Sequence, residues 1–358
     1  MKITVITCPF GALPPNGVGA VEKLFHLLAV EWVKMGHEVC FVCAGGGDNP
    51  KIEYRRLKKY NRTGSTKTDL IWDFFYSVKA IWHCPKTDVL LCNTFWTPFL
   101  APLMRWKYKK LVYGVHRFPK RQFFLYPFVH KFICVSTVVA NALKRQVAAE
   151  RVCVVVNPID TSVFKPEPRR IVEGRVLYAG RVHPLKGLRC LAEACRSLAE
   201  EGLVKELVLV GPWETGKGGG GQSFVDELKA LAGACPVVLR GAVSNPCELA
   251  SIERSAEVFV YPSEDALGEA CPVAPMEAMA LGVPTVVSGL ACYDDYVLDG
   301  EDAFKFPTSN SKELTRIIRR LLTDESLRMR IGKSASLDVS KLSAVNVAAW
   351  YMDEFDHA

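Results

Sequence analysis

Residues 2–44 begin with the apolar run KITVIT (2–7), continue with AVEKLFHLLAVEWVKMG (20–36) and end with HEVCFVCA (37–44). The two short runs have the length and composition of strands, whereas the middle segment repeats apolar residues with the 3.6-residue period of a helix. A strand, a helix and a second strand in this order form the unit from which parallel sheets covered on both faces are built. The stretch therefore predicts an α/β fold.

The same alternation of strand-like and helical patterns continues along the chain. In the first half the later strand-like runs include KLVYGV (110–115) and FICVS (132–136). The pattern then restarts with RVLYAG (175–180), ELVLVG (206–211) and VFVYPS (258–263). A chain of 358 residues is long enough for two hydrophobic cores. We expect two Rossmann-like, doubly wound domains.

The segment FKPEPRR (164–170) combines two prolines with mixed charge and is the best candidate for the linker. We expect an N-terminal domain at 1–166 and a C-terminal domain at 172–340. The last stretch, 341–358, has a helical pattern with several aromatic residues. This final helix either packs back on the N-terminal domain or closes the second domain.

The thirteen cysteines are scattered singly, many of them inside apolar runs. This is typical of small buried side chains in a reducing compartment, so no disulfide framework is expected. Cys40 and Cys43 are spaced as C-x-x-C but have no second pair nearby, and neither a metal nor a redox site is predicted. No uncharged apolar run reaches the roughly 18 residues of a spanning helix, and the first run reads as a strand rather than a signal peptide. We expect a cytoplasmic protein.

Charge is divided unevenly along the chain. Residues 1–165 hold 24 Lys and Arg against 10 Asp and Glu, whereas residues 166–358 hold 21 against 28. Between residues 95 and 128, basic and aromatic residues are interleaved: Arg105, Trp106, Lys107, Tyr108, Lys109, Lys110, Lys120, Arg121, Phe123 and Phe124. This mixture suits peripheral attachment to an anionic membrane surface, and equally a core strand and helix with a solvated edge. No nucleic-acid-binding module is recognised, so nucleic acid is not an expected partner.

Ligands of doubly wound folds bind beyond the carboxyl ends of the strands, and charged residues lie at those places here. Arg181 and Lys186 follow the strand RVLYAG in GRVHPLKG (180–187). Two bases at this spacing are also common in a solvated turn. At a strand end, however, a guanidinium fork and an ammonium point charge suit a diphosphate, with each charge-assisted contact contributing about 1.5–3 kcal/mol.

Two glutamates, Glu269 and Glu277, lie in EACPVAPMEAMALGVP (269–284). Either Pro272 or Pro275 can occupy the first turn of a helix that contains Glu277 and leaves Glu269 in the preceding loop. The free amides and the dipole of such a helix N-terminus attract anions, and carboxylates beyond the phosphates can bind sugar hydroxyls. Taken alone, two glutamates eight positions apart are usually surface residues.

The loop after the first strand contains Gly17 and Gly19, which permit close backbone approach. The loop resembles a dinucleotide fingerprint but lacks the third glycine, so NAD binding is a weak prediction. His116 also lies just past a strand, in VYGVHRFP (112–119). A single histidine is more often structural, and its position alone makes it a candidate.

The ordered motifs resemble the retaining glycosyltransferases of family 4, which have the GT-B fold. They are PPNGVGAVE (14–22), GHEV (36–39), VNPIDTSVF (156–164), GRVHPLKG, ELVLVG, SAEVFVYPSE (255–264) and the E-x7-E pattern from Glu269 to Glu277. The resemblance implies two Rossmann-like domains facing a central cleft. It also implies a metal-independent transfer of a hexose-type sugar, with retention, from a UDP- or GDP-linked donor to a glycan or lipid-linked acceptor. No cofactor is implied.

The resemblance also implies roles for individual residues. Arg181 and Lys186 would stabilise the leaving diphosphate, Glu269 and His116 would contact the donor sugar, and Glu277 would bind the ribose. The backbone near Gly211 and Val243 would line the base pocket, the amide of Val273 would face the phosphates, and Gly17 and Gly19 would lie near the transferred sugar and acceptor. Two departures from the family pattern are Pro272, which removes an amide near the phosphates, and the long loop GPWETGKGGGGQS (211–223).

Two alternatives remain open at the level of sequence. Residues 211–217 spell G-x4-G-K after a strand, as in a P-loop NTPase, but Gly218 stands where Ser or Thr would hold Mg²⁺. The second alternative keeps the GT-B fold in a nucleotide-sugar epimerase or a non-catalytic nucleotide-sugar binder.

Overall fold

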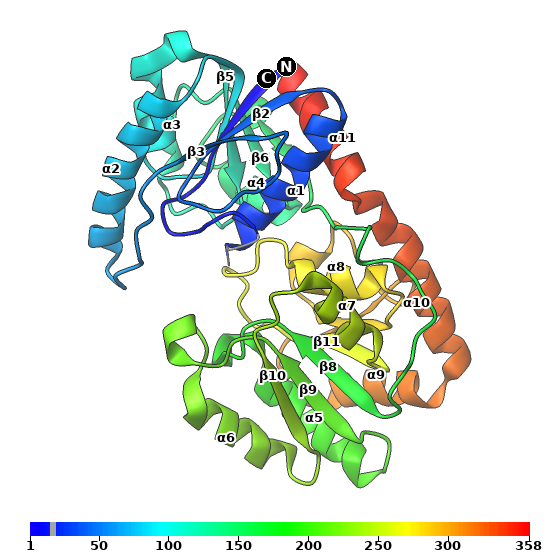
Figure 1. Cartoon of the computed structure of the whole chain (residues 1–358). Helices are drawn as coiled ribbons and strands as arrows, with labels where there is room; N and C mark the ends of the chain where they lie inside the picture. The colour runs from blue at the N-terminus through cyan, green and yellow to red at the C-terminus, as the bar shows by residue number, and fades with distance from the viewer. Residues whose placement is uncertain (15–18) are drawn as a thin grey trace. The chain divides into compact units, whose positions relative to one another are not determined.

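The computed structural model describes residues 1–14 and 19–358. The chain divides into two compact units (Figure 1). Unit 1 consists of Met1–Pro158 together with Ala344–Ala358, and unit 2 consists of Ile159–Ser343. Each unit is built on its own sheet, and each is described by itself below.

Within the described residues, the sheet of unit 1 has seven strands in the order β3-β2-β1-β4-β5-β6-β7, and all neighbours are parallel. The strands are β1 (Lys2–Ile6), β2 (Glu38–Cys43), β3 (Glu53–Arg56), β4 (Thr87–Cys92), β5 (Tyr108–Val115), β6 (Lys131–Cys134) and β7 (Val152–Val154). The α-helices are α1 (Ala20–Lys34), α2 (Thr66–His83), α3 (Thr97–Leu100), α4 (Thr137–Leu143) and α11 (Ala344–Asp356), and the 3₁₀ turn η1 (Ala101–Lys107) follows α3. The order reverses between β1 and β4, which is the topological switch point of this sheet.

Helix α11 completes the core of unit 1 although it follows all of unit 2 in the chain (Figure 1). Trp32 of α1 is fully buried against the rings of Tyr351 and Phe355, with ring centroids 5.9 and 5.7 Å away. The Trp32 indole also donates a hydrogen bond of 3.1 Å to the carbonyl of Ala348. Of the two positions considered for the last helix, the structure therefore has the one on the N-terminal unit.

Within the described residues, the sheet of unit 2 has six parallel strands in the order β10-β9-β8-β11-β12-β13. The strands are β8 (Arg175–Ala179), β9 (Glu206–Val210), β10 (Val237–Gly241), β11 (Val258–Tyr261), β12 (Thr285–Ser288) and β13 (Phe304–Phe306). The α-helices are α5 (Leu188–Glu200), α6 (Gly221–Ala232), α7 (Pro246–Arg254), α8 (Val273–Ala280), α9 (Ser311–Thr323) and α10 (Glu325–Val339). The order reverses between β8 and β11, so the residues after these two strands lie at the switch point.

The boundary between the units lies between Pro158 and Ile159, earlier than the linker expected at 164–170. Phe164 is buried, and the Arg169 guanidinium donates to the backbone carbonyls of Arg254, Ala256 and Gly282. The expected linker is therefore held against unit 2, because its apolar and cationic side chains both find partners there.

Among the described residues, no helix combines the length and apolarity needed to cross a bilayer. The thirteen cysteines are all free thiols, and most are buried. Cys40 and Cys43 lie inside β2, where burial raises the pKa of both thiols.

Candidate functional site

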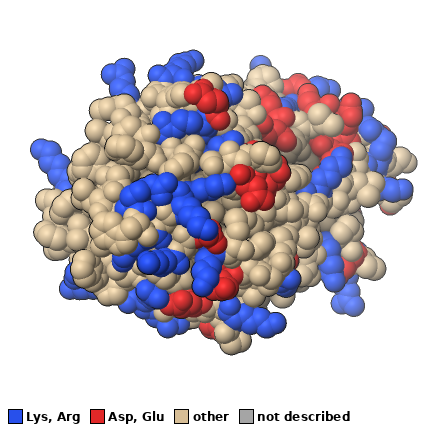
Figure 2. All heavy atoms as spheres, turned by 90° about the horizontal axis from the view of Figure 1, so that it is seen from above, with Lys and Arg blue, Asp and Glu red and all other residues tan. Residues whose placement is uncertain are grey.

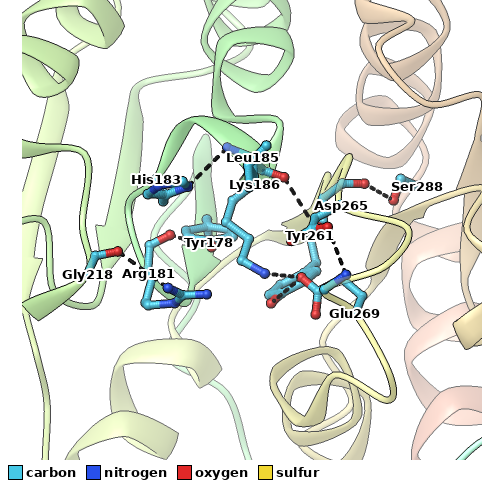
Figure 3. Close-up of polar contacts among 12 residues, drawn as sticks. Tyr178, Arg181, His183, Leu185, Lys186, Gly218, Tyr261, Asp265, Glu269 and Ser288 are labelled. Carbon is cyan, nitrogen blue, oxygen red and sulfur yellow. Dashed lines mark hydrogen bonds and ion pairs between the residues drawn. The ribbon is translucent and has the colours of Figure 1, made fainter. Parts of the chain in front are cut away.

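Three candidate residues of unit 2, Arg181, Lys186 and Glu269, follow the neighbouring strands β8 and β11 and lie close together (Figure 3). Arg181 follows β8, and Lys186 ends the 3₁₀ turn η4 (Pro184–Lys186) that leads into α5. Glu269 lies in the loop between β11 and α8. Because β8 and β11 are neighbours in the sheet, all three residues lie at one edge of it, beyond the strand ends where the motifs were expected.

Lys186 and Glu269 form a buried ion pair between the ammonium nitrogen and the carboxylate Oε1 (Figure 3). Their side chains keep only 6% and 7% of their exposure. The hydroxyl of Tyr261 donates a second hydrogen bond, of 3.2 Å, to the same carboxylate oxygen. A charge pair so far from water persists because each group satisfies the other. The family resemblance implied that Lys186 binds the diphosphate and Glu269 the donor sugar. The contact between the two side chains was not predicted.

Arg181 differs from Lys186 because its guanidinium is exposed. Its Nη1 lies 3.5 Å from the carbonyl of Gly218, in the glycine-rich loop after β9. The neighbouring turn is fixed by His183, whose Nδ1 accepts a 3.3 Å hydrogen bond from the amide of Leu185. The site thus offers one buried cation held by a carboxylate and one exposed cation near a glycine-rich loop.

The loop of residues 211–223 lies next to Arg181. Gly211 has φ 135°, and a Cβ there would overlap the carbonyl of Gly180, so only glycine lets the ends of β8 and β9 approach this closely. Lys217, the lysine of the P-loop-like spelling, is exposed and paired with Glu214 at 2.6 Å. Val243 follows β10, two residues after that strand ends.

Helix α8 begins at Val273, with Pro272 as its N-cap and Pro275 as its third residue. From the sequence, either proline was a candidate for the first turn, and Pro272 was expected to remove an amide from the anion site. In the structure Pro275 is the proline in that turn, and the two first-turn residues before it that have a backbone N–H are Val273 and Ala274. Glu277 lies inside the helix and is buried, and Glu269 precedes it in the loop, as expected.

In unit 1, His116 follows β5 directly and its ring meets Phe25 edge-on, with centroids 5.0 Å apart. Both ring nitrogens are shielded from solvent. Burial lowers the pKa of His116 to about 4, with the Arg117 charge acting in the same direction and Asn157 against it. The imidazole is therefore neutral at pH 7.

The loop before α1 is described only in part, because Gly17 lies outside the described residues. Gly19 is the N-cap of α1, and a Cβ on it would overlap the carboxylate of Glu22. That carboxylate is buried and accepts a 3.0 Å hydrogen bond from the Cys8 thiol. Burial and then the Glu22 charge raise the pKa of Cys8 to about 12. Gly19 thus serves packing at this point, whatever else it contacts.

Two family models match the chain one after the other. Residues 19–163 match Glycosyltransferase Family 4, and residues 164–338 match Glycosyl transferases group 1. The chain is a glycosyltransferase. It is 25% identical to the lipopolysaccharide 1,2-N-acetylglucosaminetransferase of Salmonella typhimurium, over 99% of this chain and 97% of that one. It is 30% identical to the MMP alpha-(1->4)-mannosyltransferase of Mycolicibacterium hassiacum, over 69% of this chain and 57% of that one.

Solved structures similar to this glycosyltransferase confirm the predicted GT-B fold. The sucrose-phosphate synthase of Thermosynechococcus elongatus superposes with a TM-score of 0.81 at 18% identity, covering 100% of this chain and 98% of that one. Anabaena HepE in complex with UDP and glucose gives a TM-score of 0.78 at 19% identity, with full coverage of both chains. At these identities the likeness concerns the fold alone.

Two tyrosines of the glycosyltransferase site escaped the sequence analysis. Tyr178 on β8 and Tyr261 on β11 stack at 5.4 Å, and the Tyr178 hydroxyl donates a 2.9 Å hydrogen bond to the carbonyl of Arg181 (Figure 3). Burial raises the pKa of both phenols well above the usual value, and the Glu269 charge raises it further. Both hydroxyls therefore remain donors at ordinary pH. The feature of the sequence that could have identified them is a tyrosine at or next to the end of each of these two predicted strands.

Only part of the basic and aromatic segment of the glycosyltransferase, residues 95–128, is exposed on unit 1. Trp106 and Phe124 are exposed, but Tyr108 and Phe123 are buried in unit 1. Tyr108 lies under the Arg105 guanidinium at 4.9 Å, and Phe123 packs on Tyr113. Of the two readings left open for this segment, the core reading therefore holds for Tyr108 and Phe123, whereas Trp106 and Phe124 face solvent.

Proposed function

We propose that this glycosyltransferase transfers a hexose-type sugar, with retention and without a metal ion, from a UDP- or GDP-linked donor to a glycan or lipid-linked acceptor. The observation that carries the proposal is the grouping of Lys186, Arg181 and Glu269 at the carboxyl edge of the unit 2 sheet. In the reaction the anomeric carbon exchanges its bond to the diphosphate oxygen for a bond to the acceptor oxygen. The acceptor's proton leaves with the nucleoside diphosphate.

The two cations support a metal-independent reaction. The departing diphosphate gains negative charge in the transition state, and fixed cations stabilise that charge best where water is excluded. Lys186 is buried, and its ion pair with Glu269 orients the ammonium group. The ammonium is therefore positioned to donate a hydrogen bond to a phosphate oxygen. Arg181 is exposed and free to approach the same diphosphate as a planar fork.

The remaining assignments complete the donor site. Glu269 binds hydroxyls of the donor sugar, Glu277 binds the ribose, and the amide of Val273 faces the phosphates. The backbone at Gly211 and Val243 lines the base pocket. His116, neutral at pH 7, contacts the sugar as a hydrogen-bonding group rather than as a cation. Gly19 is assigned to the side of the transferred sugar and acceptor, and Gly17, which the resemblance assigns there too, lies outside the described residues.

The identity of donor and acceptor rests on the relatives. Among the solved structures of similar fold, HepE was obtained with UDP and with UDP-glucose. The relatives include a lipopolysaccharide N-acetylglucosaminetransferase and a capsular polysaccharide biosynthesis glycosyltransferase, CapM, of Staphylococcus aureus. We assign the chain to polysaccharide biosynthesis at the cytoplasmic face of a membrane. The basic unit 1 supports peripheral attachment there.

A thermal-shift panel of UDP, GDP, ADP and their sugar conjugates, run with a metal chelator, tests the donor site. A ligand at a hundred times its dissociation constant stabilises a protein by about 2.7 kcal/mol, which such a panel resolves. One nucleotide series should raise the Tm of the wild type and fail to raise that of Lys186→Ala or Glu277→Ala. Lys312→Ala and Glu193→Ala, at exposed positions of unit 2, should respond like the wild type.

No response to any nucleotide would contradict the proposal at its first step. With a responding donor, proton NMR of the first product formed on an acceptor reports whether the anomeric configuration is retained. Turnover of the donor without any acceptor would instead favour an epimerase, and binding without any turnover would favour a nucleotide-sugar binding protein.

A further inference from the structure

Helix α2 of unit 1 has two apolar faces, and only one of them belongs to the core. Its inner face buries Tyr76, Ala80 and Ile81. Its outer face carries large apolar side chains that are exposed to solvent: Ile71 54%, Phe74 36%, Phe75 51%, Val78 45% and Trp82 70%. These residues recur at intervals of three and four, so they form one continuous stripe along the helix. An apolar stripe of this kind facing water marks an interaction surface.

The stripe continues onto the next helix. Phe74 meets the ring of Trp96 edge-on at 5.5 Å, and Trp96 meets Phe99 of α3 at 5.8 Å. Phe99 is 47% exposed, and Leu103 and Trp106 in the adjoining turn η1 are 72% and 67% exposed. We call the α2 stripe together with Phe99 the outer apolar face.

The charged groups around the outer apolar face are mainly basic. Lys67 and Lys79 are exposed on α2, and the ammonium of Lys107 lies 5.8 Å from the Trp82 ring while it bonds carbonyls at the end of α2. The acidic residues of α2 are turned inward or engaged: Asp73 is buried and accepts the amides of Phe95 and Trp96, and Asp69 binds Thr63. In Figure 2 the side of the molecule on which α2 and α3 lie shows tan and blue, and red gathers elsewhere.

We propose that the outer apolar face inserts into the headgroup region of a bilayer that contains anionic lipid. Apolar and aromatic side chains enter the acyl boundary, and the surrounding lysines meet the phosphates. A second copy of this chain is a poorer occupant, because a symmetric contact would place the basic rim of one copy against the basic rim of the other. The inference rests on the membrane attachment proposed above and deepens it: it names the α2 stripe and Phe99 as the surface that enters the bilayer.

Vesicle sedimentation tests this insertion. The wild type should bind vesicles of phosphatidylglycerol and phosphatidylcholine and should retain part of that binding between about 0.1 M and 0.5 M salt, since screening weakens only the charged contacts. Phe75→Ser/Trp82→Ser should bind at least about tenfold more weakly at both salt concentrations, because each lost ring removes inserted area. Lys67→Gln/Lys79→Gln should lose only the salt-sensitive part.

The matched control is Met329→Ser/Leu337→Ser on α10 of unit 2, which removes two equally exposed apolar side chains, 67% and 60%. It should bind vesicles like the wild type. Absence of wild-type binding, or equal binding by the Phe75/Trp82 variant, would overturn the proposal. A wild-type dimer in light scattering that this variant abolishes would assign the face to a second copy instead. The nucleotide-induced thermal shift, measured on every variant, reports the donor site separately.

Discussion

At the scale of single residues, the buried Lys186–Glu269 pair should contribute strongly to the stability of unit 2. Removing one partner of a buried pair leaves an uncompensated charge and costs about 3–5 kcal/mol. We expect Lys186→Met to lower the free energy of unfolding by that amount in urea titrations, and Lys186→Met/Glu269→Gln to recover part of the loss. The exposed pair Lys205–Glu173, at 2.8 Å in the same unit, is the control, and Lys205→Met should leave the free energy of unfolding nearly unchanged. Equal costs for the two lysines would show that the buried pair does not form.

Tyr261 is a positioning residue, since it acts through the Glu269 carboxylate that it orients. Tyr261→Phe keeps the ring stack on Tyr178 and removes only the hydrogen bond. A hydrogen bond to a charged group contributes about 1.5–3 kcal/mol, so kcat should fall by about tenfold or more while the dissociation constant of the nucleoside diphosphate changes little. Tyr351→Phe, which alters a buried tyrosine of unit 1, should leave both constants unchanged. A rise in KM alone would assign Tyr261 to donor binding instead.

His116 makes the stability of unit 1 depend on pH. Its pKa in the folded chain is about 4, below the usual value near 6.5, so the unfolded chain binds the proton more tightly. Its contribution is therefore fully present above about pH 6.5 and is lost as the pH falls toward 4, with a slope of at most about 1.4 kcal/mol per pH unit. Urea titrations at several pH values should therefore show that the difference in unfolding free energy between the wild type and His116→Gln becomes smaller as the pH is lowered from about 6.5 toward 4. Asp73, whose pKa burial raises to about 6, titrates oppositely but is common to both proteins.

At the scale of elements, α11 should contribute strongly to the free energy of unfolding of unit 1, because it buries aromatic side chains against Trp32. Phe355 is fully buried on Trp32, so Phe355→Ala should lower the free energy of unfolding by about 3–5 kcal/mol. Trp350 lies on the same helix but is 42% exposed, and Trp350→Ala should cost far less. Urea titration of both variants checks the difference. Similar costs would mean that α11 does not dock on α1 in solution.

The elements themselves were largely predictable from sequence. The apolar patterns of KITVIT and of residues 20–36 indicate a strand and a helix that pack against a core. Each pattern lies within a single short segment, so it can be recognised without knowing the rest of the fold. The contact between Lys186 and Glu269 was not predictable in this way, because 83 positions separate the two residues and no periodicity relates them. Whether Tyr108 and Phe123 lie in the core or at a membrane interface stayed open for a different reason, since aromatic residues suit both environments equally well.

At the scale of the whole molecule, the two units differ in how the chain builds them. Unit 2 is one continuous segment, Ile159–Ser343, with its own sheet and the donor-site candidates. We therefore expect the segment 159–343, produced alone, to unfold cooperatively and to show the same nucleotide-induced thermal shift as the full chain. Lys186→Ala within the segment should abolish that shift. A folded segment that binds no nucleotide would mean that unit 1 supplies essential donor contacts.

Unit 1, in contrast, is made of two segments that flank unit 2 in the chain. During synthesis its first 158 residues leave the ribosome early, yet the helix that covers Trp32 is translated only after all of unit 2. Folding of domains usually proceeds from the N-terminus as synthesis advances. Here the final step is different, because Trp32 on α1 lacks the side chains that bury it until α11 has been translated. Premature termination before residue 344 would yield an intact second unit joined to an unfinished first one.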